Sequence, residues 1–321
     1  MVSRERGRGR PSPPSRAGSA PVAGPVVVVE HLEKRYGGLV AVSDVSFEVE
    51  AGEIFGILGP NGSGKTTTVE CLQGLRSFDA GSVRVLGFDP AHQANELRRH
   101  IGAQLQESAL PDRMKVWEAL QLFASLRPGG LPWESVMAEW GLAEKRNAAF
   151  ANLSGGQQQR LFVALALVNA PKVVFLDEMT TGLDPASRRV AWGLIDRVRE
   201  QGTTVVMVTH FMDEAERLCD RVAVIHRKSV IVTGSPAELV AKIGGSGEVT
   251  FTTDDDVPFL GSVSGVEHVA REGRRVTVTG TGPLLAYVAA ALVAHGITPA
   301  DLEVRRARLE DVFLQLTDGH R

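Results

Sequence analysis

One continuous segment, EIFGILGPNGSGKTTTVECLQGL at residues 53–75, limits what this chain can fold into more than any other. Its apolar run at residues 54–58 predicts a buried strand, and a helix is expected from Lys65 onward. The pattern G-x-x-x-x-G-K-T lies between them, and its glycines allow the backbone to curl so that successive N–H groups point at one anion. A chance glycine turn is the alternative, but such a turn does not require a strand before it and a helix after it. The segment therefore predicts an α/β fold with a phosphate-binding loop at the end of a buried strand.

The residues of this loop have separate expected roles. Lys65 brings a full positive charge to the β- and γ-phosphates, and the hydroxyl of Thr66 is a hard oxygen ligand for Mg²⁺. The backbone N–H groups of residues 62–67 are expected to surround the α- and β-phosphates. The residues expected to bind a nucleotide here are Gly59, Pro60, Asn61, Gly62, Ser63, Gly64, Lys65, Thr66 and Thr67.

A second strand ends in two acidic residues. Residues 173–176 form a continuous apolar run, which is typical of a strand buried on both faces of a parallel sheet. Asp177 and Glu178 follow at its carboxyl end, the edge where open α/β sheets bind ligands. An acidic pair ending a strand is often only a solvated surface. After a phosphate loop, however, one carboxylate can hold Mg²⁺ and the next can take a proton from an attacking water.

A phosphate loop alone is compatible with kinases, GTPases and many ATPases, and the segment LSGGQQQR at residues 153–160 separates them. This segment looks like the signature motif of ABC ATPases, for which a P-loop kinase has no use. Together with GPNGSGKTT, FLDE, the GLD at residues 182–184 and His210, it resembles the nucleotide-binding domain of ABC transporters over residues 26–243. The resemblance implies an α/β P-loop NTPase core of the ABC type, with an antiparallel β subdomain and a helical subdomain at about residues 107–153. It also implies ATP and Mg²⁺ as ligands.

The resemblance assigns roles to single residues. Glu178 would be the base for the attacking water, and His210 would lie at the γ-phosphate. Tyr36 would stack on adenine, although taken alone it would also suit the core at a strand end. Gln106 falls where the family has the glutamine that reaches Mg²⁺ and the attacking water, with Gln104 as the near rival. The expected catalytic residues are Glu178, His210 and Gln106, and the expected magnesium ligands are Thr66, Gln106 and Asp177.

The signature motif is itself a second anion site. Ser154 offers a hydroxyl and two glycines offer unobstructed N–H groups at the expected start of a helix. The resemblance implies that this motif covers the nucleotide held by the phosphate loop of a second copy, so that two chains pack head to tail around two ATP molecules. The residues expected at that shared face are Ser154, Gly155, Gly156, Gln157 and Asp184.

Two positions depart from the family pattern. Met179 stands where a proline usually follows the catalytic glutamate, and the turn HRKSVI at residues 226–231 lacks the glycine often found between the last two strands. Neither departure is expected to touch the chemistry.

The chain divides into three regions. Residues 1–25 contain five arginines and one glutamate among glycine, proline and serine, which predicts a disordered basic tail. The nucleotide-binding domain is expected at residues 26–243. Residues 244–321 read as a small C-terminal α+β domain, whose last segment, LEDVFLQLT, has the periodicity of an amphipathic helix. That segment resembles the tail of ATPase subunits from ABC-2-type exporters, including the daunorubicin-resistance kind.

Composition and apolar patterning restrict the partners. A formal net charge of −3 gives no reason to expect nucleic acid, and no apolar segment is long enough to cross a bilayer. The resemblance to ABC exporters implies a separate polytopic membrane permease as the partner, with this chain in the cytoplasm at the inner face of the membrane. The favoured cargo is a hydrophobic drug or antibiotic. Lipid, polysaccharide or peptide export and a soluble, non-transport ABC ATPase stay open as alternatives.

Overall fold

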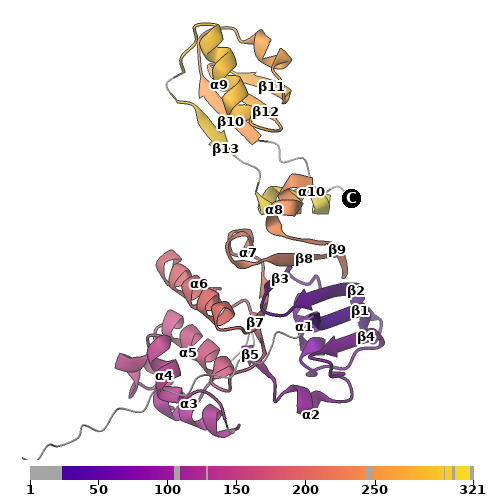
Figure 1. The fold of residues 1–321 in the computed structure, drawn as a ribbon, viewed down its shortest axis with the longest axis vertical. Helices are drawn as coiled ribbons and strands as arrows, with labels where there is room; N and C mark the ends of the chain where they lie inside the picture. Colours follow the sequence, from indigo (N-terminus) through magenta and orange to yellow (C-terminus); the bar gives the residue numbers. More distant parts are fainter. Residues whose placement is uncertain are drawn as a thin grey trace, which may run out of the picture.

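The computed structural model describes residues 24–104, 109–127, 129–242, 247–299, 301–305 and 308–318. Its centre is a six-stranded sheet with the strand order β5-β6-β7-β3-β8-β9 (Figure 1). The neighbouring strands from β5 to β8 pair in parallel, and β9 pairs antiparallel with β8. The strands are β3 (Ile54–Leu58), β5 (Ile101–Gln104), β6 (Val173–Asp177), β7 (Thr204–Thr209), β8 (Arg221–His226) and β9 (Ser229–Gly234).

The prediction of strands buried on both faces is confirmed for the centre of this sheet. Every residue of β3, β6 and β7 is buried, as the continuous apolar runs require. Because these strands are parallel neighbours, their carboxyl ends meet at one edge, and the phosphate loop and the acidic pair both begin there.

An antiparallel sheet with the order β2-β1-β4 covers one face of the central sheet. It consists of β1 (Pro25–Tyr36), β2 (Leu39–Glu50) and β4 (Ala80–Val85). Phe47 of this sheet stacks on Phe55 of β3, with ring centroids 5.2 Å apart, so that the two sheets share one apolar core. Helix α1 (Lys65–Leu72), which packs against β2 and β4, joins the same core, and the short helix α2 (Ala94–Leu97) follows β4.

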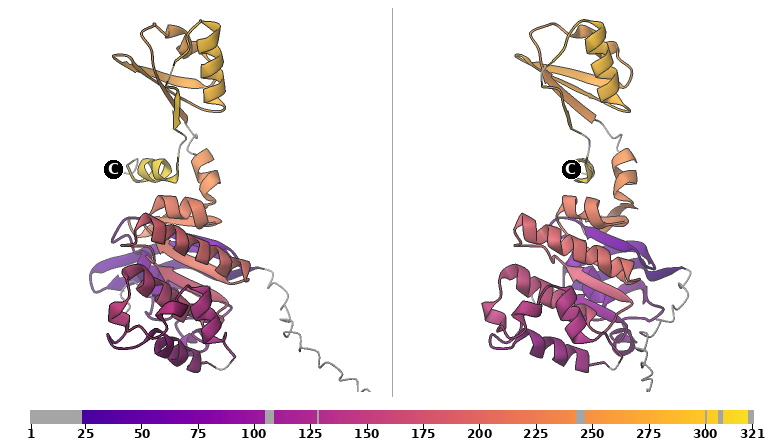
Figure 2. Two further views of the ribbon diagram at one scale, coloured as in Figure 1. Left: turned by 90° about the vertical axis from the view of Figure 1, so that its left-hand side faces the viewer. Right: turned by 60° about the vertical axis from the view of Figure 1, so that its left-hand side comes forward.

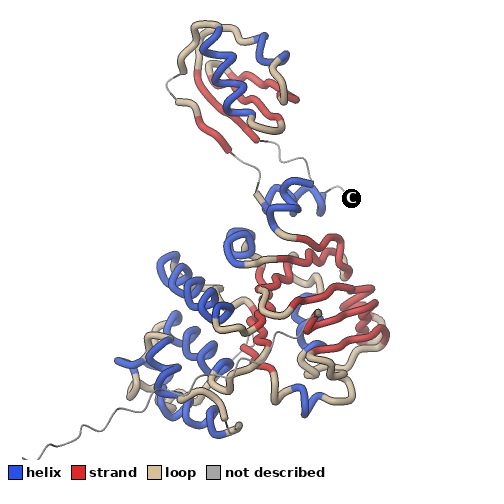
Figure 3. The backbone as a smooth tube through the Cα atoms, in the orientation of Figure 1, coloured by secondary structure: helices blue, strands red, loops and turns tan. Residues whose placement is uncertain are grey.

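Helices α3 to α6 lie on the side of the core domain away from the antiparallel sheet, where Figure 3 shows them in blue. Helices α3 (Val116–Ser125), α4 (Trp133–Glu139) and α5 (Gly155–Leu167) pack on one another, with short 3₁₀ turns at Ala143–Lys145 and Phe150–Asn152. Helices α6 (Pro185–Glu200), α7 (Met212–Leu218) and α8 (Pro236–Lys242) follow the strands of the central sheet. No helix in the described part of the chain is both long and apolar enough to cross a membrane.

The chain then leaves this core domain, residues 24–242, and forms a separate lobe at residues 247–305 (Figure 2). The lobe has a sheet of order β11-β12-β10-β13, one covering helix and a core of its own. Its elements are β10 (Gly247–Thr252), a 3₁₀ turn (Pro258–Ser262), β11 (Val266–Glu272), β12 (Arg275–Gly280), α9 (Leu284–Ala294) and β13 (Glu303–Arg305).

The last helix, α10 (Leu309–Asp318), buries its apolar residues in the core domain rather than in the core of the lobe, although Arg305 of the lobe pairs with Asp311 at 3.1 Å. It returns to the core domain and lies against α7 and α8 (Figure 1). Leu309 and Val312 are buried there and belong to the apolar cluster of the core domain. The apolar face that the sequence predicted for this helix therefore contacts the core domain and not the lobe.

Candidate active site

The phosphate loop follows β3 directly and takes a shape that needs glycine. Gly59 and Gly64 have φ angles of 155° and 106°, in the region that favours glycine. A Cβ atom at Gly59 would lie 2.2 Å from the carbonyl oxygen of Ile225, and one at Gly64 would lie 2.6 Å from that of Ala41. The neighbouring backbone thus excludes any side chain at these two positions. Pro60, Asn61 and Gly62 are exposed at the tip of the loop, Ser63 is buried, and Thr66 and Thr67 are half-buried at the start of α1.

Lys65 is buried within its own loop. Its ammonium group donates to the carbonyl oxygens of Gly59 at 2.8 Å and Pro60 at 3.1 Å. Burial lowers the pKa of Lys65, while the charges of Glu178 and Asp177 act in the opposite direction. A cation whose donors are held by neutral carbonyl groups is ready to exchange them for phosphate oxygens.

Asp177 lies at the end of β6 and suits a cation ligand. Burial, and then the charge of Glu178, raise the pKa of Asp177 to about 6, whereas the Thr66 hydroxyl and Lys65 lower it. Among the described residues, the buried Oδ1 atom of Asp177 has no hydrogen-bond partner. A buried carboxylate oxygen without a hydrogen-bond partner, next to a threonine hydroxyl, provides the hard oxygen ligands that Mg²⁺ prefers. The residues present therefore fit the ion.

Glu178 and His210 face each other across the edge of the sheet. The Nδ1 atom of His210 lies 3.1 Å from Oε1 of Glu178, and the Glu178 side chain is only 11% exposed. The backbone N–H of Glu178 donates to the carbonyl oxygen of Val208 at 2.9 Å, although its φ of 49° lies in the left-handed region. β7 lies between β3 and β6, and it brings His210 between the phosphate loop and the acidic pair. Lys65, Asp177, Glu178 and His210 thus form one cluster.

The signature residues form a second cluster. Ser154 caps α5, and its backbone N–H donates to Oε1 of Gln157 at 3.0 Å. Asp184 caps α6 and accepts the N–H groups of Ala186 and Ser187, both at 2.9 Å. A Cβ atom at Gly156 would lie 3.4 Å from the Ser187 hydroxyl oxygen, so the two helix starts are adjacent. Ser154, Gly155 and Asp184 are exposed.

The two clusters lie on different helices of one chain. Helix α5 packs with α3, α4, β5 and β6, whereas α1, which carries Lys65, packs with β2 and β4 (Figure 1). The two anion sites predicted from the sequence are therefore carried by different helices, α1 and α5.

Tyr36 ends β1 with 40% of its surface exposed, which favours a stacking surface over a core position. Cations of Lys34 and Arg76 lie 5.4 and 5.7 Å from its ring centroid. Gln106 lies outside the described residues, so its predicted place at the metal and the attacking water is not described. Its rival, Gln104, is buried at the end of β5.

Sequence reasoning missed two residues next to this site. Glu214 of α7 is fully buried and accepts a hydrogen bond from Trp192 Nε1 at 3.0 Å. Lys228, in the turn between β8 and β9, donates to the carbonyl oxygen of Gly62. The turn HRKSVI therefore contacts the phosphate loop, which the sequence did not predict, and whether it affects the chemistry stays a prediction. Its missing glycine was the available signal.

A parallel sheet whose phosphate loop, paired carboxylates and histidine share one edge defines a nucleotide-hydrolysing P-loop protein. Comparison with known proteins narrows this class. The family model described as ABC transporter matches residues 42–181. The Nod factor export ATP-binding protein I of Ralstonia nicotianae is 38% identical over 304 residues, covering 91% of this chain and 94% of the relative. The daunorubicin resistance ATP-binding protein DrrA2 of Streptomyces coeruleorubidus is 35% identical over 311 residues, covering 93% and 96%.

A solved structure described as the ATP binding subunit of an ABC transporter has a TM-score of 0.62 and 25% identity, and the match covers 68% of this chain and 93% of that one. The chain belongs to the ABC transporter ATP-binding family, whose members hydrolyse ATP to drive transport. The family resemblance and the fold class predicted from the sequence are confirmed.

Proposed function

We propose that this chain hydrolyses ATP as a head-to-tail dimer and thereby drives a separate membrane permease that exports a hydrophobic compound such as a drug or antibiotic. The separation of the two anion sites supports the dimer. The Lys65 cluster holds the groups for the metal and the attacking water, whereas the exposed Ser154 and Gly155 offer a hydroxyl and an N–H group to a phosphate from outside the chain. Two copies packed head to tail would place the second cluster of one against the first cluster of the other.

Within this dimer each residue has a defined task. Lys65 would bind the β- and γ-phosphates and Glu178 would accept a proton from the attacking water, while His210 holds the Glu178 carboxylate in place. Asp177 and Thr66 would hold Mg²⁺, with Gln106 as a further ligand. The ion supplies charge neutralisation at the phosphates. Ser154, Gly155 and Gly156 of the partner copy would close the site over the γ-phosphate.

The names of the relatives support export and leave the cargo open. Daunorubicin resistance favours a drug or antibiotic, and Nod factor export favours a different cargo for the same ATPase. The helical subdomain offers the surface for the permease, because Leu122 and Leu126 of α3 and its end are 47% and 69% exposed. The chain would then lie at the cytoplasmic face of the membrane.

The test is recovery of the tagged full-length chain with a polytopic membrane protein from detergent-solubilised membranes of its own cells. Leu126→Glu should reduce this recovery at least severalfold, because it places a charge on the apolar contact surface. Leu39→Glu, which changes an equally exposed leucine at the β1–β2 turn, is the matched control and should have no effect. A full-length chain that never sediments with membranes would contradict the permease and favour a soluble ABC ATPase.

A further inference from the structure

The turn between β8 and β9 is attached to the phosphate loop. The ammonium group of Lys228 donates to the carbonyl oxygen of Gly62 at the exposed tip of the loop. The carbonyl oxygen of Lys228 accepts the backbone N–H of Ser43 in β2 at 2.7 Å. Lys228 is therefore held from both sides, by the antiparallel sheet through its backbone and by the phosphate loop through its side chain.

The backbone conformation of this turn does not favour lysine. Arg227 and Lys228 have φ angles of 46° and 75°, a left-handed conformation that glycine adopts without strain and other residues do not. Glycine at either position would satisfy the local geometry better. A long cationic side chain kept in a strained conformation, in contact with a binding loop, indicates a role for the side chain itself.

The charge of Lys228 is also uncompensated in its surroundings. No ion pair joins its ammonium group to a carboxylate in the described ranges of the chain, and it donates instead to the neutral carbonyl of Gly62. Lys65, by contrast, feels the charges of Asp177 and Glu178. An ammonium group on the carbonyl of Gly62 polarises the peptide that joins Gly62 to Ser63, and it leaves positive charge beside a loop built for phosphate.

We propose that Lys228 is a nucleotide-affinity residue, which fixes the tip of the phosphate loop through Gly62 and adds a second positive charge for the phosphates of the bound nucleotide. The proposal rests on the nucleotide site proposed above. It applies to binding rather than to the chemical step, because Lys228 reaches the outer tip of the loop and not the cluster of Glu178 and His210.

The experiment compares Lys228→Gly with Arg227→Gly in the full-length chain. Each variant removes one cation and relieves one strained residue of the same turn, but only the first removes the contact with Gly62. Titration with a fluorescent ATP analogue should show a dissociation constant about threefold to tenfold higher for Lys228→Gly, in the range of one solvent-exposed hydrogen bond. Arg227→Gly should bind as the wild type does. The turnover number at saturating ATP should stay within about twofold for both.

Two further measurements separate an electrostatic role from a structural one. The affinity difference should shrink when KCl is raised from about 50 to 500 mM, and Lys228→Arg should recover most of the affinity. Equal dissociation constants for Lys228→Gly and wild type, or equal weakening by Arg227→Gly, would overturn the proposal. Lys65→Ala distinguishes failure of the proposed nucleotide site from failure of the role proposed for Lys228. If wild type and Lys65→Ala bind ATP equally, the assignment of the nucleotide site is wrong, and the role of Lys228 is wrong with it.

Discussion

At the scale of single residues, Glu178 has a strained backbone and a side chain with a defined partner. Its left-handed φ of 49° is unfavourable for a residue with a side chain, yet its N–H group completes a hydrogen bond to β7 and its carboxylate faces His210. The conformation therefore points the side chain over the edge of the sheet, where the proposed attacking water would lie. Asp177, one residue earlier, is 4% exposed and faces Thr66 instead.

Glu178→Gln should keep ATP binding and slow turnover by about 10²–10⁴-fold, the usual range for loss of a general base. The amide keeps the size and the hydrogen-bonding capacity of the carboxylate but cannot accept the proton. Steady-state phosphate release and equilibrium binding of ATP measure the two effects. Turnover at the wild-type rate would show that the base lies elsewhere.

The same variant should accumulate as a dimer with ATP and Mg²⁺, because unhydrolysed γ-phosphates would continue to join the two anion clusters. Size-exclusion chromatography detects this dimer. Adding Ser154→Arg should abolish it by placing bulk against the opposing nucleotide, while a dimer that survives this change would contradict the head-to-tail arrangement.

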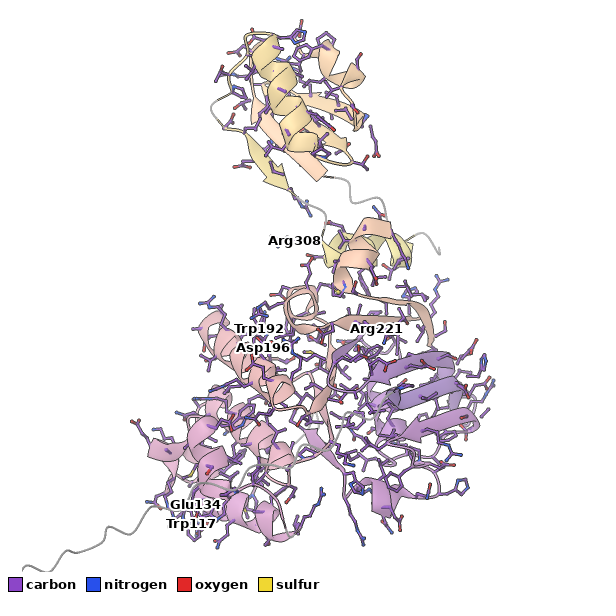
Figure 4. The ribbon with its side chains drawn as sticks, in the orientation of Figure 1. Trp117, Glu134, Trp192, Asp196, Arg221 and Arg308 are labelled. Carbon is purple, nitrogen blue, oxygen red and sulfur yellow. The ribbon has the colours of Figure 1, made fainter. Side chains whose placement is uncertain are left out.

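At the scale of elements, Glu214 joins the helix that follows His210 to the helix that follows Asp184. It lies on α7, is fully buried, and accepts the indole N–H of Trp192 on α6, which Figure 4 labels. Burial raises the pKa of Glu214, and the nearby Thr209 hydroxyl and the hydrogen bond from Trp192 oppose this rise. A carboxyl group with a raised pKa keeps its proton in the folded state at a pH where the unfolded chain has already lost it.

The raised pKa of Glu214 determines how this residue changes the free energy of unfolding with pH. Its stabilising contribution is fully present below the ordinary value of 4.5 and is lost as pH rises through the folded-state pKa. Glu214→Gln keeps an acceptor for Trp192 but does not titrate, so its melting temperature relative to wild type should increase as pH rises above this value. Thermal unfolding from about pH 4.5 to 8 without nucleotide measures the difference. Glu134→Gln, which removes an exposed carboxylate from α4, is the control (Figure 4). A pH-independent difference for Glu214→Gln would contradict this account.

At the scale of the whole molecule, α10 attaches the end of the C-terminal region to the core domain. Arg308, labelled in Figure 4, marks the point where the chain returns from the lobe. The first N–H group of α10, that of Leu309, donates to Oε1 of Glu216 on α7 at 3.2 Å, and the Arg308 N–H donates to Asp311 at 2.8 Å. A side chain of the core domain thus helps to cap a helix that lies beyond the lobe.

Leu309→Ala should destabilise the core domain by roughly 2–4 kcal/mol, because a leucine that is 1% exposed would leave a cavity between α10, α7 and α8. Leu314→Ala, on the same helix but 51% exposed, should change the free energy of unfolding by less than about 0.5 kcal/mol. Urea denaturation of the full chain measures both. Equal effects would show that α10 does not contribute to the core domain.

On the present contacts, we propose a domain division in which the lobe is residues 247–305 and α10 belongs to the core.

The sequence by itself determined the chemistry that depends on neighbouring residues. The strand, the glycine loop, Lys65 and the pair at Asp177 and Glu178 are contiguous, and their backbone shape follows from local propensity and periodicity. For the same reason the helix start at the signature motif could be predicted from Ser154 and the glycines after it.

Only the tertiary structure decided which distant residues join the site and where the last helix lies. Lys228 reaches Gly62 across 166 positions of sequence, and Trp192 reaches Glu214 from another helix. The amphipathic face of α10 was evident in the sequence, but its partner was not, because periodicity shows that a face will be buried and not what will cover it. Contacts of this kind depend on the order in which the strands pair and on the direction in which the chain returns, and no local pattern encodes either of them.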